Sequence, residues 1–203
     1  DWINTNQFFL IFNTTMNNNL ISVQGVSKVF KVGEGNFTAL RDINLEIDSG
    51  SFMSFVGPSG SGKTTILNLI GGLDVPTTGN IFFKNTKLSA MNRNQMAQYR
   101  RKNIGFIFQT YNLLPVYSVY ENILFPLLLS GSKEKDARER VMNIINKVGL
   151  SDQVKKRPSQ LSGGQCQRVA IARALVKDPL LILADEPTAN LDSKNSLQIL
   201  ELM

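Results

Sequence analysis

One glycine-rich stretch carries the clearest chemical pattern in the sequence. Residues 57–64 match GxxxxGK[ST], and they lie between an apolar run, residues 52–56, that predicts a strand and a run after Gly62 with helical spacing. Glycines here let successive backbone N–H groups turn toward phosphate oxygens, and the helix start adds the positive end of its dipole. We name residues 57–65 the phosphate loop and predict that it binds MgATP. Its members are Gly57, Pro58, Ser59, Gly60, Ser61, Gly62, Lys63, Thr64 and Thr65.

Particular chemistry is expected of two phosphate-loop side chains and of two acidic residues far along the chain. Lys63 would neutralise phosphate charge, and the Thr64 hydroxyl would bind Mg²⁺, which prefers oxygen ligands. Asp185 and Glu186 follow an apolar run, residues 180–184, that is typical of a buried parallel strand. Ligands of open α/β sheets bind at the carboxyl ends of such strands, so Asp185 is predicted to be a second magnesium ligand.

Glu186 points to the opposite side of the extended chain from Asp185, which favours a group that polarises an attacking water. By themselves, an aspartate and a glutamate after a strand more often belong to a loop or a helix cap. Together with the phosphate loop they favour ATP hydrolysis.

The composition limits the kind of protein that carries these residues. A chain of 203 residues with 42% hydrophobic residues suits one sizeable domain. The net charge of +6 would suit an acidic partner, but the basic clusters at 100–102 and 155–157 are short and flank apolar segments, which favours solvated surface over nucleic-acid binding. The single cysteine, Cys166, excludes an internal disulfide and fits a reducing compartment. No apolar stretch approaches the ~20 residues of a membrane-spanning helix.

The elements that must position the site can be placed from hydrophobic periodicity. Residues 20–30 and 39–47 predict an antiparallel pair joined by a turn at 33–36, and residues 104–108 predict another strand. A helix is expected around Ala137 to Val148, with Ser132 as its cap and Gly149 as its end.

A further helix, from Gly164 to Val176, begins with a second glycine-rich motif. Its start reads Leu-Ser-Gly-Gly-Gln over residues 161–165, in which a serine hydroxyl and two glycines form a second anion-binding nest. With the sequence RVAIARAL at 168–175 and Asp185-Glu186-Pro187 downstream, the chain resembles the ATP-binding cassette (ABC) family, whose signature is LSGGQ. The resemblance implies that Ser162, Gly163, Gly164 and Gln165 contact ATP.

The resemblance gives roles to three more residues. Gln109 is similar to the glutamine that senses Mg²⁺ and γ-phosphate, as a third magnesium ligand, and contacts the membrane partner. Asp192, in Asn190-Leu191-Asp192, is similar to the D-loop aspartate that bridges two subunits. Phe30 is similar in placement to the aromatic residue that stacks on adenine, although a core phenylalanine explains it almost as well.

The resemblance covers the chain from Leu20 onward and implies an α/β fold: a P-loop NTPase core with a mostly parallel sheet, an N-terminal antiparallel β subdomain and an inserted α-helical subdomain at about 110–176. Residues 105–131 resemble the branch that drives lipoprotein release and macrolide export. We expect the ATP-binding domain over 16–203 and a non-native or disordered extension over 1–15, with Met16 as the natural start.

Two departures from the family pattern stand out. Cys166 follows the signature where Gln or Arg is usual, at a helix start that can lower a thiol pKa, so we weigh a neutral substitution against thiol control of dimer closure. The sequence has no histidine, whereas the family carries a switch histidine beyond the D-loop. We therefore expect a C-terminally truncated chain that lacks the last core strands.

The resemblance implies an ATPase subunit that pairs head to tail with a second copy and powers a transmembrane permease, from a peripheral position on the cytoplasmic face of the membrane. ATP and Mg²⁺ are its expected cofactors. Two alternatives stay open. One is a soluble cassette ATPase acting on ribosomes or DNA, although such relatives usually carry two cassettes or a long insertion. The other is a truncated ATP-binding module without turnover.

Overall fold

The computed structural model describes residues 19–188 and divides the chain after Met96 into two compact units. Each unit is described by itself. The expected extension at 1–15 and the expected D-loop with Asp192 lie outside the described residues.

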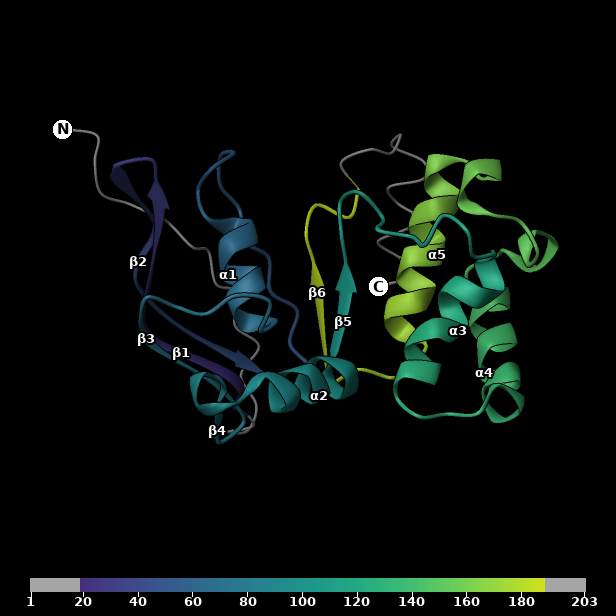
Figure 1. Cartoon of the computed structure of the whole chain (residues 1–203), viewed down its shortest axis with the longest axis horizontal. Helices are drawn as coiled ribbons and strands as arrows, with labels where there is room; N and C mark the ends of the chain where they lie inside the picture. Colours follow the sequence, from purple (N-terminus) through teal and green to yellow (C-terminus); the bar gives the residue numbers. More distant parts are fainter. Residues whose placement is uncertain (1–18, 189–203) are drawn as a thin grey trace. The chain divides into compact units, whose positions relative to one another are not determined.

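The first unit contains a four-stranded antiparallel sheet (Figure 1). Its strands are β1 (Asn19–Val32), β2 (Gly35–Asp48), β3 (Thr78–Phe83) and β4 (Thr86–Lys87), in the order β2-β1-β3-β4. The predicted antiparallel pair is confirmed, with a tighter turn than expected, because Val32 already pairs with Gly35. Gly33 takes φ +60° in that turn, a conformation that glycine adopts without strain.

Helix α1 (Lys63–Ile70) directly follows the phosphate loop and contacts β2. Its apolar face, Ile66, Leu69 and Ile70, is buried. The apolar side chains of the sheet that are also buried include Ile21, Val23, Val26, Leu40, Ile43 and Ile81. This packing holds the helix that begins at the phosphate loop. A 3₁₀ turn, Leu88–Ala90, and helix α2 (Arg93–Asn103) follow β4.

The strand predicted at residues 52–56 is not formed among the described residues. This segment is irregular, and Phe52 and Val56 are 78% and 73% exposed. An apolar run becomes a strand only where a neighbouring strand satisfies its backbone groups, and the sheet of the first unit contains four other strands. The prediction was therefore wrong for this segment, although the loop and helix after it are as expected.

The second unit contains a parallel pair of strands covered by a helix (Figure 1). Strand β5 (Ile104–Ile107) pairs with β6 (Leu181–Ala184) in register, Ile107 opposite Ala184. Helix α5 (Gly163–Leu175) packs on them through Ile171 and Ala174. A Cβ atom on Gly105 would lie 2.9 Å from the carbonyl oxygen of Ala174, so only glycine permits this close approach of helix and strand.

Three helices form the larger core of the second unit. Helices α3 (Val119–Leu129) and α4 (Glu134–Lys147) pack against each other and against α5, and two 3₁₀ turns, Ser151–Gln153 and Pro158–Gln160, connect α4 to α5. The buried side chains include Ile123, Leu127, Val141, Ile145, Val169 and Ala172. Within residues 19–188, no helix combines the length and apolar character needed to cross a bilayer.

The start of α4 corrects the expected cap. Lys133 is the N-cap and makes no side-chain capping bond, while the Ser132 N–H donates to the carbonyl oxygen of Leu127 at the end of α3. The serine thus belongs to the end of one helix instead of the start of the next. Gly149 takes φ +68° just after α4, as expected for a helix end.

Candidate functional site

The phosphate loop is shaped by glycines that no other residue could replace without strain. Gly60 and Gly62 take φ +79° and +92°. A Cβ atom on Gly62 would lie 2.7 Å from the Ala39 carbonyl oxygen and 2.7 Å from a Leu40 methyl group, so the strand β2 would have to move. Gly62 is also the N-cap of α1 and supplies no side-chain acceptor to the first turn. A helix start of this kind is suited to bind an anion.

Lys63 lies over this loop. Its ammonium donates to the carbonyl oxygens of Gly57 and Pro58, at 2.8 and 2.9 Å. The loop is closed by a backbone bond from the Ser61 N–H to the Pro58 carbonyl oxygen, at 3.2 Å. The positive charge is therefore held at the loop itself, where phosphate charge would be neutralised.

Gln109, Asp185 and Glu186 come together in the second unit. Gln109 follows β5 and the two carboxylates follow β6, and parallel pairing brings the carboxyl ends of both strands to one edge. The Gln109 Nε2 donates to Glu186 Oε2 at 3.0 Å, and the Asp185 N–H donates to the Ile107 carbonyl oxygen at 2.9 Å. Glu186 takes φ +46°, so the extended chain assumed for it from the sequence is not observed.

The loop after Gln109 is held by a side chain that sequence reasoning missed. Tyr111 and Asn112 take φ +59° and +47°, the left-handed region that non-glycine residues rarely adopt. The Arg173 guanidinium donates to both of their carbonyl oxygens, at 2.7 Å to Tyr111. Burial lowers the pKa of Arg173. This contact joins the loop carrying Gln109 to the helix carrying the signature, and the only sequence signal for it was the RVAIARAL run.

A second missed residue, Asn122, fixes the other end of the same loop. Its buried amide accepts from the Leu114 N–H and donates to the carbonyl oxygens of Leu114, Tyr117 and Ser118. Ser118 caps α3 with Glu121 in a reciprocal capping box. The bonds from the Ser118 N–H and hydroxyl lower the pKa of Glu121. The loop from 109 to 118 is therefore held at both ends by side-chain hydrogen bonds, although it contains no helix or strand.

The signature forms the start of α5. Ser162 is the N-cap: its hydroxyl accepts from the Gln165 N–H at 3.3 Å, and its own N–H donates to Gln165 Oε1 at 2.9 Å. Gly163 and Gly164 make the first turn, in which Gly163 is exposed and Gly164 is buried. The signature is thus a capped helix start with a serine hydroxyl at its tip.

Cys166 does not have the lowered thiol pKa that its position at a helix start suggested. The thiol is buried, its Sγ lies 3.6 Å from the carbonyl oxygen of Pro158, and burial raises its pKa. Desolvation of the thiolate outweighs the helix dipole here. The structure therefore supports the neutral substitution over thiol control.

Phe30 lies near the end of β1, opposite Phe37 of β2, and the residue is 37% exposed. It belongs to the same unit as the phosphate loop, whereas Gln109, Asp185, Glu186 and the signature belong to the second unit. Among residues 19–188 no three side chains of histidine, cysteine, aspartate or glutamate gather into a metal site.

Comparison with known proteins adds to this geometry. Residues 40–189 match the family model described as ABC transporter. An ABC transporter ATP-binding protein of Thermotoga maritima is 47% identical over 87% of this chain and 76% of its own. The lipoprotein-releasing system ATP-binding protein LolD of Legionella pneumophila is 44% identical over 93% of this chain and 83% of its own. The dimeric cassette MJ0796 bound to ADP and Pi matches with a TM-score of 0.84 and 42% identity, over 90% of this chain and 80% of that one.

Proposed function

The chain belongs to the ABC transporter family and is an ATP-binding subunit with ATPase activity, and we propose that two copies share the ATP sites through which it powers a membrane complex. The observation that carries the hydrolytic part is the 3.0 Å contact between Gln109 and Glu186 at the edge formed by β5 and β6. A carboxylate held there by an amide is suited to accept a proton from an attacking water.

The phosphate loop is the proposed seat of the triphosphate. The start of α1 offers backbone N–H groups without a capping side chain, and Lys63 exchanges its two carbonyl partners for phosphate oxygens. Since carbonyl oxygens are weaker partners for an ammonium than charged phosphate oxygens, this exchange favours binding. Phe30 is proposed to stack on the adenine.

The donor set proposed for Mg²⁺ fits that ion. Thr64, Gln109 and Asp185 supply hydroxyl, amide and carboxylate oxygens, and Mg²⁺ usually keeps several waters and binds substrate phosphates beside one or two protein ligands. When bound, the ion would neutralise charge on the phosphate oxygens.

The second half of each ATP site is proposed to come from another copy. Ser162, Gly163 and Gly164 of one copy would face the phosphate loop of its partner, with Gln165 holding the serine in place and Asp192 bridging the two copies. The support is the dimeric state of the similar cassette MJ0796 and the capped helix start, which leaves the Ser162 hydroxyl proton available to a phosphate oxygen.

A membrane permease is the proposed partner, met through Gln109 and the loop up to Tyr120. The similar protein LolD is named as the ATP-binding protein of a lipoprotein-releasing system, which supports a membrane partner. The proposed place of the chain is the cytoplasmic face of that membrane, and its proposed ATP-binding domain spans 16–203 with the helical part at about 110–176. The relatives described above are cassettes of transporters, and they give no support to action on ribosomes or DNA.

The replacement Glu186→Gln tests the proposal. It keeps the contact with Gln109 possible but removes the proton acceptor, so MgATP should hold the full chain as a dimer that does not turn over. Size-exclusion chromatography with light scattering, at saturating MgATP, measures this state. Glu139→Gln on the exposed face of α4 is the matched control and should remain active. Monomeric Glu186→Gln chains at saturating MgATP would contradict the shared site.

A further inference from the structure

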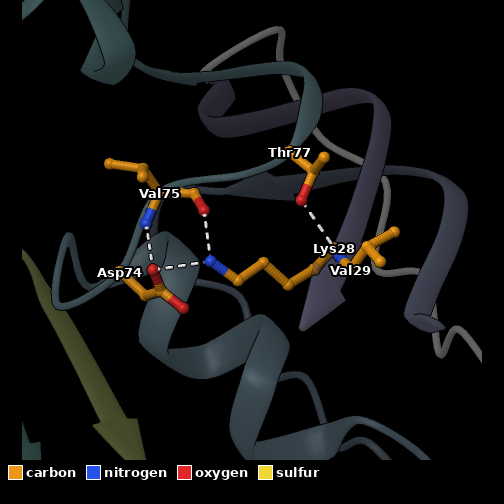
Figure 2. A network of polar contacts seen from close by, with 5 residues as sticks. All are labelled: Lys28, Val29, Asp74, Val75 and Thr77. Atoms are coloured by element: carbon orange, nitrogen blue, oxygen red, sulfur yellow. Dashed lines mark hydrogen bonds and ion pairs between the residues drawn. The ribbon is translucent and has the colours of Figure 1, made fainter. Parts of the chain in front are cut away.

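Lys28 is a buried lysine of β1 whose ammonium turns toward the loop that follows α1. Its side chain is 11% exposed, and Nζ lies 2.7 Å from Asp74 Oδ1 and donates to the Val75 carbonyl oxygen at 2.8 Å (Figure 2). Asp74 in turn accepts from the Val75 N–H at 2.7 Å. The ion pair is therefore fixed at both ends.

The same loop is bound to β1 at a second place. The Val29 N–H donates to the Thr77 hydroxyl at 3.0 Å (Figure 2). The Thr77 N–H donates to the Ser27 carbonyl oxygen at 2.9 Å. The pairing of β1 with β3 ends at Ser27 and Thr78, so these bonds continue the attachment of the loop beyond the sheet.

The loop in question is the direct continuation of the phosphate-loop helix. The N–H groups of Leu73 and Asp74 donate to the Asn68 carbonyl oxygen, so the last turn of α1 is hydrogen-bonded to the segment that contains Asp74. Lys28 and Thr77 therefore tie the helix that begins at the phosphate loop to the strand that carries Phe30.

Lys28 also touches Phe30 itself. Nζ lies 4.9 Å from the centroid of the Phe30 ring, within the range of a cation–π contact. The ammonium occupies one face of the ring, while 37% of Phe30 remains exposed. A ring held on one side in this way presents its remaining face in a fixed orientation.

Burial of a lysine costs free energy that an apolar side chain of similar length would avoid. A methionine could fill the same space, so packing alone does not require the charge at residue 28. What the charge adds is the pair of directed contacts, to the loop after α1 and to Phe30.

We propose that Lys28 is a positioning residue for the adenine end of the ATP site. It orients the Phe30 ring by direct contact, and its bonds to Asp74 and Val75 fix the distance from that ring to the phosphate loop. The inference rests on the proposed stacking of adenine on Phe30. Its consequence is selective, because the contact acts on ligands that carry a base and leaves the binding of phosphates alone.

The test compares MgATP with magnesium tripolyphosphate, which lacks base and ribose, by calorimetric titration of the full chain. For Lys28→Met we expect about a fivefold loss of ATP affinity, the size of a cation–π contact, with tripolyphosphate affinity unchanged. Phe30→Ala should show the same selective loss. Lys84→Met is the matched control, since Lys84 is exposed and lies 5.9 Å from the ring of Phe83; it should change neither affinity.

The outcomes separate the role of Lys28 from the stacking of adenine on Phe30. A selective loss in Phe30→Ala with none in Lys28→Met, or an equal loss of both ligands in Lys28→Met, overturns the role of Lys28 alone. No selective loss in Phe30→Ala overturns adenine stacking and the inference with it. Failure of the unaltered chain to bind tripolyphosphate contradicts the phosphate loop itself. If Lys28→Met does not fold, Asp74→Asn decides: a selective loss of ATP affinity supports the role, and an unchanged ratio of the two affinities overturns it.

Discussion

The two glycine-rich helix starts of the chain are built in opposite ways. Helix α1 begins at Gly62, in the left-handed conformation and without a capping side chain, and Lys63 lies over the preceding loop. Helix α5 begins at Ser162, which is capped reciprocally by Gln165. The first start has no side-chain cap and has a lysine ammonium beside it, whereas in the second the Gln165 N–H is already bonded to the Ser162 hydroxyl.

The two helix starts should therefore contribute differently to ATP binding. A helix start without a side-chain cap is suited to bind an anion through its backbone N–H groups. A capped start gains little from an anion except through the serine hydroxyl, which can still donate its proton. Under the proposed function, the phosphate loop would supply most of the affinity, and the signature would add a contact once nucleotide is bound to a partner copy. Each of the following changes tests one side of this division.

Loss of the Lys63 charge at the start of α1 should have the largest effect on ATP affinity. Lys63→Met removes a charged partner of the phosphates, for which we expect about a 100-fold loss of ATP affinity, corresponding to the ~1.5–3 kcal/mol of hydrogen bonds to charged groups. Unfolding should be unchanged, because Lys63 contacts only two loop carbonyl oxygens. Calorimetric titration and thermal unfolding measure the two effects. Lys135→Met, at an exposed residue of α4, is the control. Equal ATP affinity in the two variants would contradict the role of Lys63.

A methyl group at the N-cap of α1 should lower the stability of the fold. Gly62→Ala forces a Cβ atom to within 2.7 Å of the Ala39 carbonyl oxygen at a φ of +92°, so the free energy of unfolding should fall by ~2 kcal/mol. Gly163→Ala, in the first turn of α5, should not lower the free energy of unfolding, because alanine is the better helix former, while ATPase activity should fall. Urea denaturation measures both. Coincident unfolding curves for Gly62→Ala and the unaltered chain would show that the loop does not require glycine.

Removal of the cap at the second start should have a smaller effect on stability. Ser162→Ala loses the capping bond of α5, and Ser118→Ala loses the equivalent bond of α3, each costing ~1 kcal/mol. Only Ser162→Ala should also weaken the MgATP-dependent dimer, which analytical ultracentrifugation measures in the Glu186→Gln background. Equal dimerisation of the two variants would remove the signature from the site.

The smallest effect is expected from a comparison of the buried Lys28 with the half-buried Lys177. Lys28 pairs with a carboxylate, whereas Lys177 donates to the Arg100 carbonyl oxygen, and burial lowers the pKa of Lys177 to about 8. Between pH 8 and its usual pKa near 10.5, the unfolded chain holds a proton at Lys177 that the folded chain does not. The contribution of Lys177 to stability therefore rises as pH rises through this window.

Lys177→Met should consequently stabilise the chain more at pH 7 than at pH 9.5, by about 1 kcal/mol after allowance for solvent screening. Chemical denaturation of both chains at the two pH values checks this. A difference between the chains that does not change with pH would show that Lys177 keeps its usual pKa in the fold.

The sequence allowed the phosphate loop, the signature helix and the antiparallel pair to be predicted because each depends on residues close together in the chain. The strand expected at 52–56 failed because a strand depends on its neighbours, which an apolar run does not specify. The Ser132 cap failed because two helix ends compete for the same serine. Contacts between distant residues, such as Lys28 with Asp74 and Arg173 with Tyr111, left no signal in the local pattern.

The central claim, that the phosphate loop of one copy meets the signature of another, can be tested by disulfide cross-linking. Two chains with Cys166→Ser and Glu186→Gln carry a single cysteine each, one as Ser59→Cys and the other as Ser162→Cys, and are mixed under mild oxidation. The claim predicts a covalent dimer containing both chains, formed only with MgATP and absent when either chain is alone. A mixture that cross-links equally without nucleotide, or in which each chain cross-links to its own copy as readily as to the other, would contradict it.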